Sequence, residues 1–183
     1  EMAIIDGFTG TLYVDPDEKT LADMKKKKLA EEEKERLLQE LKDKEDVTLD
    51  GTKVKLYANI GDVSDVAEVL KSNAAGIGLF RSEFLYLEKK TYPTEEEQFQ
   101  TYRLAVEMMA GKPVVIRTID IGADKRAPYM EGEPFHLEQE NNPAMGLRGI
   151  RLSLKKEELF KTQLRAILRA GAYGEVSILY PLI

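Results

Sequence analysis

The stretch PVVIRTIDIGADK, residues 113–125, begins as an apolar strand and ends among charged side chains. A surface strand alternates apolar and polar residues, whereas residues 114–116 are continuously apolar, which is typical of a parallel strand covered on both faces. Arg117 and Asp120 therefore follow the carboxyl end of a buried strand. Ligands of parallel sheets bind at this end, so the stretch predicts both a fold class and the place of a site.

Further strands and helices are predicted on both sides of this stretch. The expected strands, each short and apolar, are 54–60, 76–81, 113–121 and 174–183. The helices expected between them are 62–74, 94–110 and 155–171. Thr94 and Glu97 have the spacing of a capping box, and Gly171 is suited to end the last helix. The order βαβαβαβ predicts an α/β fold with a parallel sheet, either doubly wound or part of a (β/α)8 barrel.

The first 50 residues have a different character. Residues 1–15 are expected to form two short strands around a turn, too small a unit to form a core alone. Residues 16–46 are rich in helix formers and in charge, with sparse apolar residues, which indicates a solvated helix or helical hairpin. We favour a connector over a calmodulin-binding or membrane-surface helix, because acidic residues interrupt the basic run.

The composition excludes several classes of protein. A net charge of −6 argues against nucleic acid or an anionic membrane as a partner held by bulk attraction. No apolar stretch approaches the roughly 20 residues of a membrane helix, and no secretory signal is recognisable, so we expect a cytoplasmic protein. The chain has no cysteine, which excludes a disulfide, a thiolate metal site and a cysteine nucleophile within it.

Two successive predicted strands end in arginine, Arg81 and Arg117. Neighbouring parallel strands lie about 4.8 Å apart, so the two guanidinium groups could converge on one anion. The planar guanidinium binds phosphate or carboxylate through paired hydrogen bonds. The alternative is that the arginines only form ion pairs with Glu83 and Asp120.

A long polar loop after the third strand favours the binding interpretation, because ordering such a loop is costly unless it binds something. Its cationic and amide side chains include Lys125, Asn141, Asn142, Arg148 and Arg151. Asp120 and Asp124 could be metal ligands or partners of the arginines. His136, the single histidine, lies in a hydrophilic stretch where exposure is usual, and we assign it no catalytic role. No phosphate-binding GxxxxGK[ST] loop or Ser/His/Asp set is present.

Five motifs together resemble the enzyme I family of the bacterial phosphoenolpyruvate:sugar phosphotransferase system, the phosphoenolpyruvate-protein phosphotransferases. They are GIGLFRSEFLYL at 76–87, PTEEEQF at 93–99, RTIDIGADK at 117–125, ENNPAMGLRGIR at 140–151 and QLRAILRA at 163–170. The resemblance extends over nearly the whole chain. RTIDIGADK after a GIGLxR strand is the most specific element, whereas the related pyruvate phosphate dikinases and phosphoenolpyruvate synthases share mainly GIGLxR.

The resemblance implies three segments. Residues 1–15 would be the last hairpin of a swivelling phosphohistidine domain, residues 16–50 a charged helical linker, and residues 51–183 the N-terminal half of a phosphoenolpyruvate-binding (β/α)8 barrel. Such barrels typically need about 250 residues, so we expect a fragment that is inactive alone. The phosphorylated histidine, the proton donor and the Mg²⁺ ligands of the family would then lie outside this chain, which would hold no catalytic or metal-ligating residue.

The resemblance also implies a function. Phosphoenolpyruvate would pass its phosphoryl group to a protein histidine and on to the phosphocarrier HPr, with Mg²⁺ as cofactor and a homodimer formed through the barrel. The substrate-binding residues would be Arg81, Arg117, Arg148, Lys125 and Asn142. Ser82 replaces the family's usual threonine and Ala123 its usual second glycine, both small changes. The alternatives are a dikinase or synthase, or a non-catalytic interaction or oligomerisation module.

Overall fold

A computed structural model describes residues 2–122, 129, 141–142 and 144–183. The predicted site residue Lys125 lies outside the described residues, as do Asp124 and His136. The chain divides into two compact units, Glu1–Glu45 and Asp46–Ile183. In the part of the chain that the structure describes, no helix is both long and apolar enough to cross a bilayer.

The first unit is a hairpin and one helix. Strands β1 (Ala3–Asp6) and β2 (Thr11–Val14) pair antiparallel. Helix α1 (Glu18–Gln39) begins where the Asp17 carboxylate accepts a hydrogen bond from the Thr20 N–H at 2.7 Å, and none of its residues is buried. Its end at Gln39 comes before the expected end of the helical stretch at residue 46, because residues 40–43 form turns instead.

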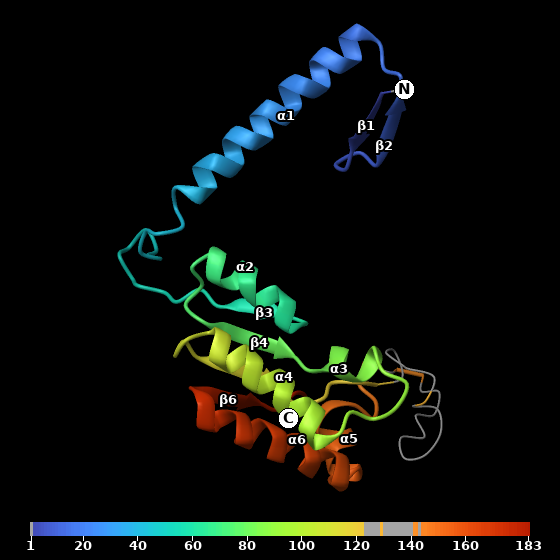
Figure 1. The fold of residues 1–183 in the computed structure, drawn as a ribbon, viewed down its shortest axis with the longest axis vertical. Coiled ribbons are helices and arrows are strands. Elements are labelled where there is room, and N and C mark those ends of the chain that lie inside the picture. The colour runs from blue at the N-terminus through green and yellow to red at the C-terminus, as the bar shows by residue number, and fades with distance from the viewer. Residues whose placement is uncertain (1, 123–128, 130–140, 143) are drawn as a thin grey trace. The chain divides into compact units, whose positions relative to one another are not determined.

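The second unit contains a four-stranded parallel sheet, which confirms the predicted α/β class (Figure 1). Its strands are β3 (Ala58–Ile60), β4 (Ile77–Arg81), β5 (Val114–Arg117) and β6 (Val176–Leu179). Their order across the sheet is the order in the sequence. Each strand is shorter than predicted, because the flanking apolar residues lie outside the hydrogen-bonded ladder.

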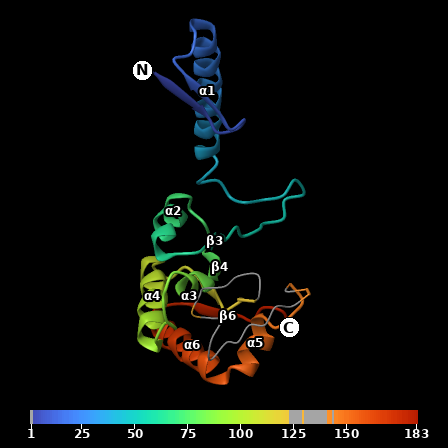
Figure 2. The ribbon, with the colours of Figure 1, turned by 90° about the vertical axis from the view of Figure 1, so that its right-hand side faces the viewer.

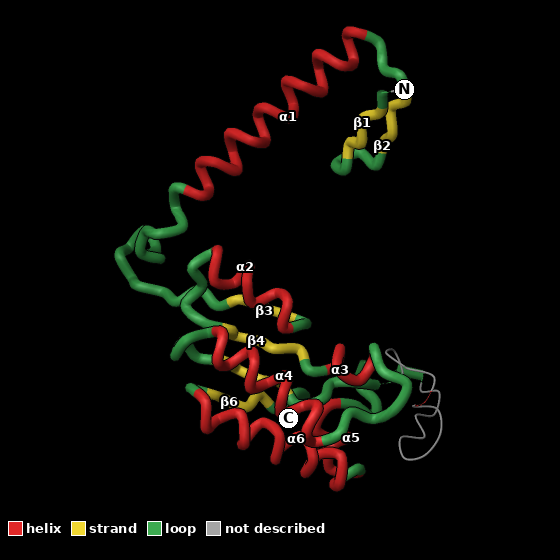
Figure 3. The backbone as a smooth tube through the Cα atoms, viewed as in Figure 1, coloured by secondary structure: helices red, strands yellow, loops and turns green. Residues whose placement is uncertain are grey.

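Helices cover one side of this sheet (Figure 2). They are α2 (Val66–Lys71), α4 (Glu95–Met108) and α6 (Glu157–Ala170). Phe80 and Ile116 of the sheet pack against Tyr102 and Ile167 of these helices, and all four are essentially inaccessible to solvent. Two short helices, α3 (Glu83–Leu87) and α5 (Gly149–Lys155), interrupt the alternation of strands and long helices (Figure 3).

The second face of the sheet differs from the expectation of strands covered on both faces. Leu79, Arg81, Val115 and Arg117 alternate with the buried residues and are only half-buried. Within the described residues, no helix covers this face, so the expectation is met on one face alone. The two arginines of the candidate site therefore share the open face of the sheet.

Helix α5 lies where the sequence predicted only a loop. Its first residue, Gly149, has φ +55° and a Cβ there would lie 2.9 Å from the Pro181 carbonyl oxygen. The Ile150 N–H donates to the same oxygen at 3.0 Å. A glycine inside a polar stretch indicates a turn, which is why a seven-residue helix was missed. Arg151, predicted as a loop residue, is in this helix and donates to the Met145 carbonyl.

Candidate substrate-binding site

The two arginines predicted to share an edge of the sheet lie on adjacent strands in register. Arg81 ends β4 and Arg117 ends β5, and their Cα atoms are paired across the ladder. Both strands run parallel, so both side chains leave the sheet at its carboxyl edge. The structure thus brings Arg81 and Arg117 together at the edge where ligands of parallel sheets bind.

Arg117 is held by two carboxylates. It forms an ion pair with Glu83, whose side chain is 3% exposed, and its Nη1 lies 3.5 Å from Oδ2 of Asp120. The other oxygen of Asp120 accepts a hydrogen bond from Nε of Arg148 at 3.0 Å. Asp120 therefore bridges two arginines. A substrate-binding role for these arginines is compatible with the ion pairs, which fix the direction of each guanidinium.

Arg81 is held differently. Its Nε donates to the Ile60 carbonyl at 3.4 Å, and its guanidinium lies 4.9 Å from the centre of the Phe84 ring. Among the described side chains, Arg81 has no carboxylate partner. Of the ion pairs considered from the sequence, the structure therefore shows those of Arg117 with Glu83 and Asp120, and none for Arg81 among the described side chains. The charge of Arg81 remains available to an anion.

Several buried polar atoms at this edge have no hydrogen-bond partner among the described residues. They are Oε2 of Glu83, Nε of Arg117 and Oγ1 of Thr118. A buried polar atom without a partner costs about 1–3 kcal/mol, and such atoms concentrate at functional sites. Unsatisfied buried polar atoms therefore lie at the edge that carries the arginines.

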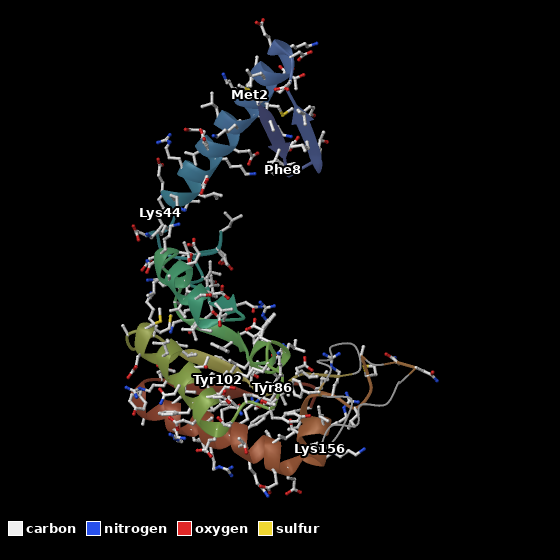
Figure 4. All side chains as sticks on the ribbon, turned by 45° about the vertical axis from the view of Figure 1, so that its right-hand side comes forward. Met2, Phe8, Lys44, Tyr86, Tyr102 and Lys156 are labelled. Atoms are coloured by element: carbon white, nitrogen blue, oxygen red, sulfur yellow. The ribbon has the colours of Figure 1, made fainter. Side chains whose placement is uncertain are left out.

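A network of buried polar side chains lies behind the arginines. Gln163 Nε2 donates to Ser82 Oγ at 3.0 Å and to the Tyr102 hydroxyl at 3.1 Å. The hydroxyls of Tyr102 and Tyr86 both donate to Oε1 of Gln98, at 3.3 and 3.1 Å. Figure 4 labels the two tyrosines, Tyr102 on α4 and Tyr86 on α3. Burial raises the pKa of both tyrosines above the ordinary value, so each remains a neutral hydrogen-bond donor.

The two glutamines of this network were not singled out from the sequence. Gln163 is fully buried and Gln98 is 1% exposed. One signal could have found Gln163, because it precedes the buried residues Ala166, Ile167 and Ala170 at helical spacing and therefore falls on the apolar face of α6. A glutamine on such a face needs partners for its amide.

Of the two remaining predicted residues, the structure describes only Asn142. Asn142 is exposed, and its carbonyl accepts a hydrogen bond from the Met145 N–H at 3.1 Å. Lys125 lies outside the described residues. Among the described Asp, Glu and His side chains, no group of three could hold a metal ion, and Asp120 contacts Arg117 and Arg148.

The sequence matches known proteins over its whole length. Residues 35–183 match the family described as PEP-utilising enzyme, PEP-binding domain, where PEP is phosphoenolpyruvate. Proteins named phosphoenolpyruvate-protein phosphotransferase are similar to the chain. That of Staphylococcus carnosus (strain TM300) is 44% identical over 180 residues, which are 98% of this chain and 30% of that protein. That of Priestia megaterium is 44% identical over 182 residues, 100% of this chain and 31% of that protein.

The chain spans about a third of the length of these relatives, 30% and 31%. The family match includes β3 to β6, the two arginines at the sheet edge and the network behind them. The match and the identity confirm the resemblance found in the sequence motifs. The chain belongs to the PEP-utilising enzymes, and residues 35–183 correspond to their PEP-binding domain.

Proposed function

We propose that this chain supplies the substrate-binding edge of a phosphoenolpyruvate-protein phosphotransferase. The enzyme would transfer the phosphoryl group of phosphoenolpyruvate to a protein histidine and then to HPr, the first step of the sugar phosphotransferase system. The observation that carries the proposal is the register of Arg81 and Arg117 at the carboxyl edge of the parallel sheet. A dikinase or synthase would also fit a PEP-binding domain, but the name of the relatives favours the phosphotransferase.

Each arginine would have its own part in binding. Phosphoenolpyruvate carries a phosphate and a carboxylate, and arginine binds both groups through paired hydrogen bonds. Arg81, without a described carboxylate partner, offers a free charge, whereas Arg117 and Arg148 are oriented by Asp120. Such preoriented charges would also stabilise the charge of the phosphoryl group during its transfer. Lys125 and Asn142 would complete the lining of the site.

The order of the strands supports the first half of a (β/α)8 barrel. A doubly wound sheet reverses its strand order, whereas β3, β4, β5 and β6 follow one another with helices on one side. Residues 51–183 would be this half, residues 16–50 the helical linker, and residues 1–15 the last hairpin of the phosphohistidine domain. The barrel would also form the homodimer.

The chemical step would depend on groups beyond this chain. We assign no catalytic residue to the chain itself, and we place the phosphorylated histidine and the proton donor elsewhere in the enzyme. Mg²⁺ would be the cofactor, but the described residues contain no group of three metal-ligating side chains, so we derive no step through it. The enzyme would act in the cytoplasm, where HPr would receive the phosphoryl group.

Replacing either arginine tests the proposal. We expect Arg81→Ala and Arg117→Ala, each made in the complete protein, to lower phosphoenolpyruvate-dependent phosphorylation of the protein by about 100-fold or more, because each removes a charge that faces the phosphoryl group. Transfer of labelled phosphoryl groups from phosphoenolpyruvate measures this loss. Arg81→Ala is the cleaner variant, since Arg117→Ala also leaves the buried Glu83 without its partner.

The matched control is Arg103→Ala on α4, which removes an arginine paired with Glu107 at 3.0 Å, remote in sequence from the strand ends. This variant should keep the activity of the parent protein. Near-parental transfer by Arg81→Ala and Arg117→Ala would contradict the proposed function of this edge.

A further inference from the structure

Gln163 forms hydrogen bonds with the segments that follow the two arginine-bearing strands, β4 and β5. It lies on α6, is fully buried, and its Nε2 donates to Oγ of Ser82, the residue that follows Arg81. Its Oε1 accepts a hydrogen bond from the N–H of Ile119 at 2.9 Å, two residues after Arg117. One amide group therefore ties the end of β4 to the end of β5.

The contact with Ile119 also affects the carboxylate that bridges two arginines. Ile119 precedes Asp120, whose oxygens contact Arg117 and Arg148. The Ile119 N–H is a buried donor, since the residue is 5% exposed, and the Gln163 oxygen is its partner. The position of Asp120, and through it the direction of two guanidinium groups, thus depends on the amide of Gln163.

The amide is held in one orientation by a third contact. Nε2 of Gln163 uses its second hydrogen on the Tyr102 hydroxyl at 3.1 Å, and that hydroxyl donates to Gln98. Both hydrogens of Nε2 and one lone pair of Oε1 are therefore in use. A group with all its contacts buried and fixed can hold its neighbours at a set spacing.

We propose that Gln163 is a positioning residue for phosphoenolpyruvate binding, whose amide sets the spacing of the segments that carry Arg81, Arg117 and Asp120. This inference rests on the proposed function. It assigns Gln163 no contact with the substrate. Small displacements of groups that hold a substrate lower binding affinity and rate by large factors. Loss of the amide should therefore shift the arginines and weaken binding of phosphoenolpyruvate.

Gln98 provides a matched comparison within the same network. It is 1% exposed, accepts hydrogen bonds from two tyrosine hydroxyls, and donates to the Pro93 carbonyl at 3.1 Å. Its partners are helical tyrosines and a residue before α4, and none of them adjoins Arg81 or Arg117. Replacing Gln98 therefore removes an equally buried amide that has no hydrogen bond of its own to the strand ends, while Gln163 keeps its bonds to Ser82 and Ile119.

The test compares Gln163→Met with Gln98→Met in the complete protein. Methionine has a similar length and no amide, so each variant loses its hydrogen bonds without a large cavity. The test determines the midpoint of thermal unfolding for each variant. Well below that temperature it determines the dissociation constant for phosphoenolpyruvate by calorimetry, together with KM and kcat. Gln163→Met should raise the dissociation constant and KM about tenfold, while Gln98→Met should leave both within about twofold, although both lower the unfolding midpoint.

Ser82→Ala is a second, milder variant that removes the acceptor of the Gln163 amide. It should raise the dissociation constant for phosphoenolpyruvate less than Gln163→Met does. If Gln163→Met does not fold, Ser82→Ala tests the positioning role of Gln163 instead. Equal dissociation constants for the parent, Gln163→Met and Ser82→Ala would overturn the positioning role alone. No binding of phosphoenolpyruvate by the parent protein would overturn the proposed function and, with it, the role of Gln163.

Discussion

Gly61 is the residue that leaves room for Arg81 at the end of the sheet. It follows β3, and a Cβ at this position would lie 2.9 Å from the Phe84 ring and 3.3 Å from Nη2 of Arg81. The ring lies beside the guanidinium, a cation–π contact worth about 0.5–2 kcal/mol. The absence of a side chain directly after β3 therefore lets an aromatic ring on α3 hold the arginine of β4.

We expect Gly61→Ala to weaken phosphoenolpyruvate binding with little loss of stability. The added methyl group displaces the Phe84 ring and the Arg81 guanidinium, both only partly buried, and leaves the main core unchanged. A rise of about threefold to tenfold in the dissociation constant, measured by calorimetry, is the expected result. Gly171→Ala is the control, because a Cβ there meets nothing within 4 Å. Equal affinities for the two variants would show that Gly61 does not control the position of Arg81.

At the scale of elements, α4 shows how a helix start predicted from the sequence is built. Thr94 Oγ1 accepts a hydrogen bond from the Glu97 N–H at 3.2 Å, and the Glu97 carboxylate accepts one from the Thr94 N–H at 2.7 Å. The predicted capping box is confirmed. The contact of Lys89 with Glu97 and the hydrogen bonds from Thr94 lower the pKa of Glu97 from 4.5 to about 2.

The lowered pKa predicts a pH dependence for this helix start. Because the pKa of Glu97 is lower in the folded protein than in the unfolded chain, its charged form adds stability that is fully present above about pH 4.5. This contribution is lost as the pH falls towards about 2. Glu97→Gln should thus be less stable than the parent at pH 7, and the difference should shrink below pH 4.5.

Urea unfolding of the parent protein and Glu97→Gln at several pH values measures this difference. Subtracting one curve from the other removes the contribution of every other carboxylate. A difference that stays constant between pH 7 and pH 3 would mean that the charge of Glu97 does not stabilise the start of α4.

At the scale of the whole molecule, the chain is built as two compact units with a boundary between Glu45 and Asp46. Residues 40–57, which include this boundary, are exposed and contain neither an α-helix nor a β-strand longer than an isolated bridge. Few buried contacts therefore hold this segment, and such segments open locally at low cost.

Limited proteolysis should consequently cut the complete protein within residues 40–57 before it cuts the sheet or its helices. Trypsin can act there after Lys42, Lys44, Lys53 or Lys55, all exposed, whereas Arg103 is half-buried and lies within helix α4. Mass spectrometry of the early products should find a fragment that begins in this segment and resists further cleavage. Early cuts within 58–122 or 144–183 would contradict the division into two units.

The sequence by itself determined the features that depend on neighbours along the chain. Strand and helix periodicity predicted the parallel α/β sheet, and the positions of Arg81 and Arg117 at strand ends predicted their shared edge. The capping residues predicted the start of α4. These features follow from local geometry, because the period of a strand or helix and the end of an element are set within a few residues.

Only the tertiary structure decided which groups meet. Glu83 forms its ion pair with Arg117, although Arg81 is nearer to it in sequence. Gln163 forms hydrogen bonds with Ser82 and Ile119, which are 81 and 44 residues away in the chain. Such contacts depend on how α6 docks on the sheet, and no sequence period records that docking. The physical reason is that packing fixes the distances between elements, whereas the sequence pattern fixes only the faces they present.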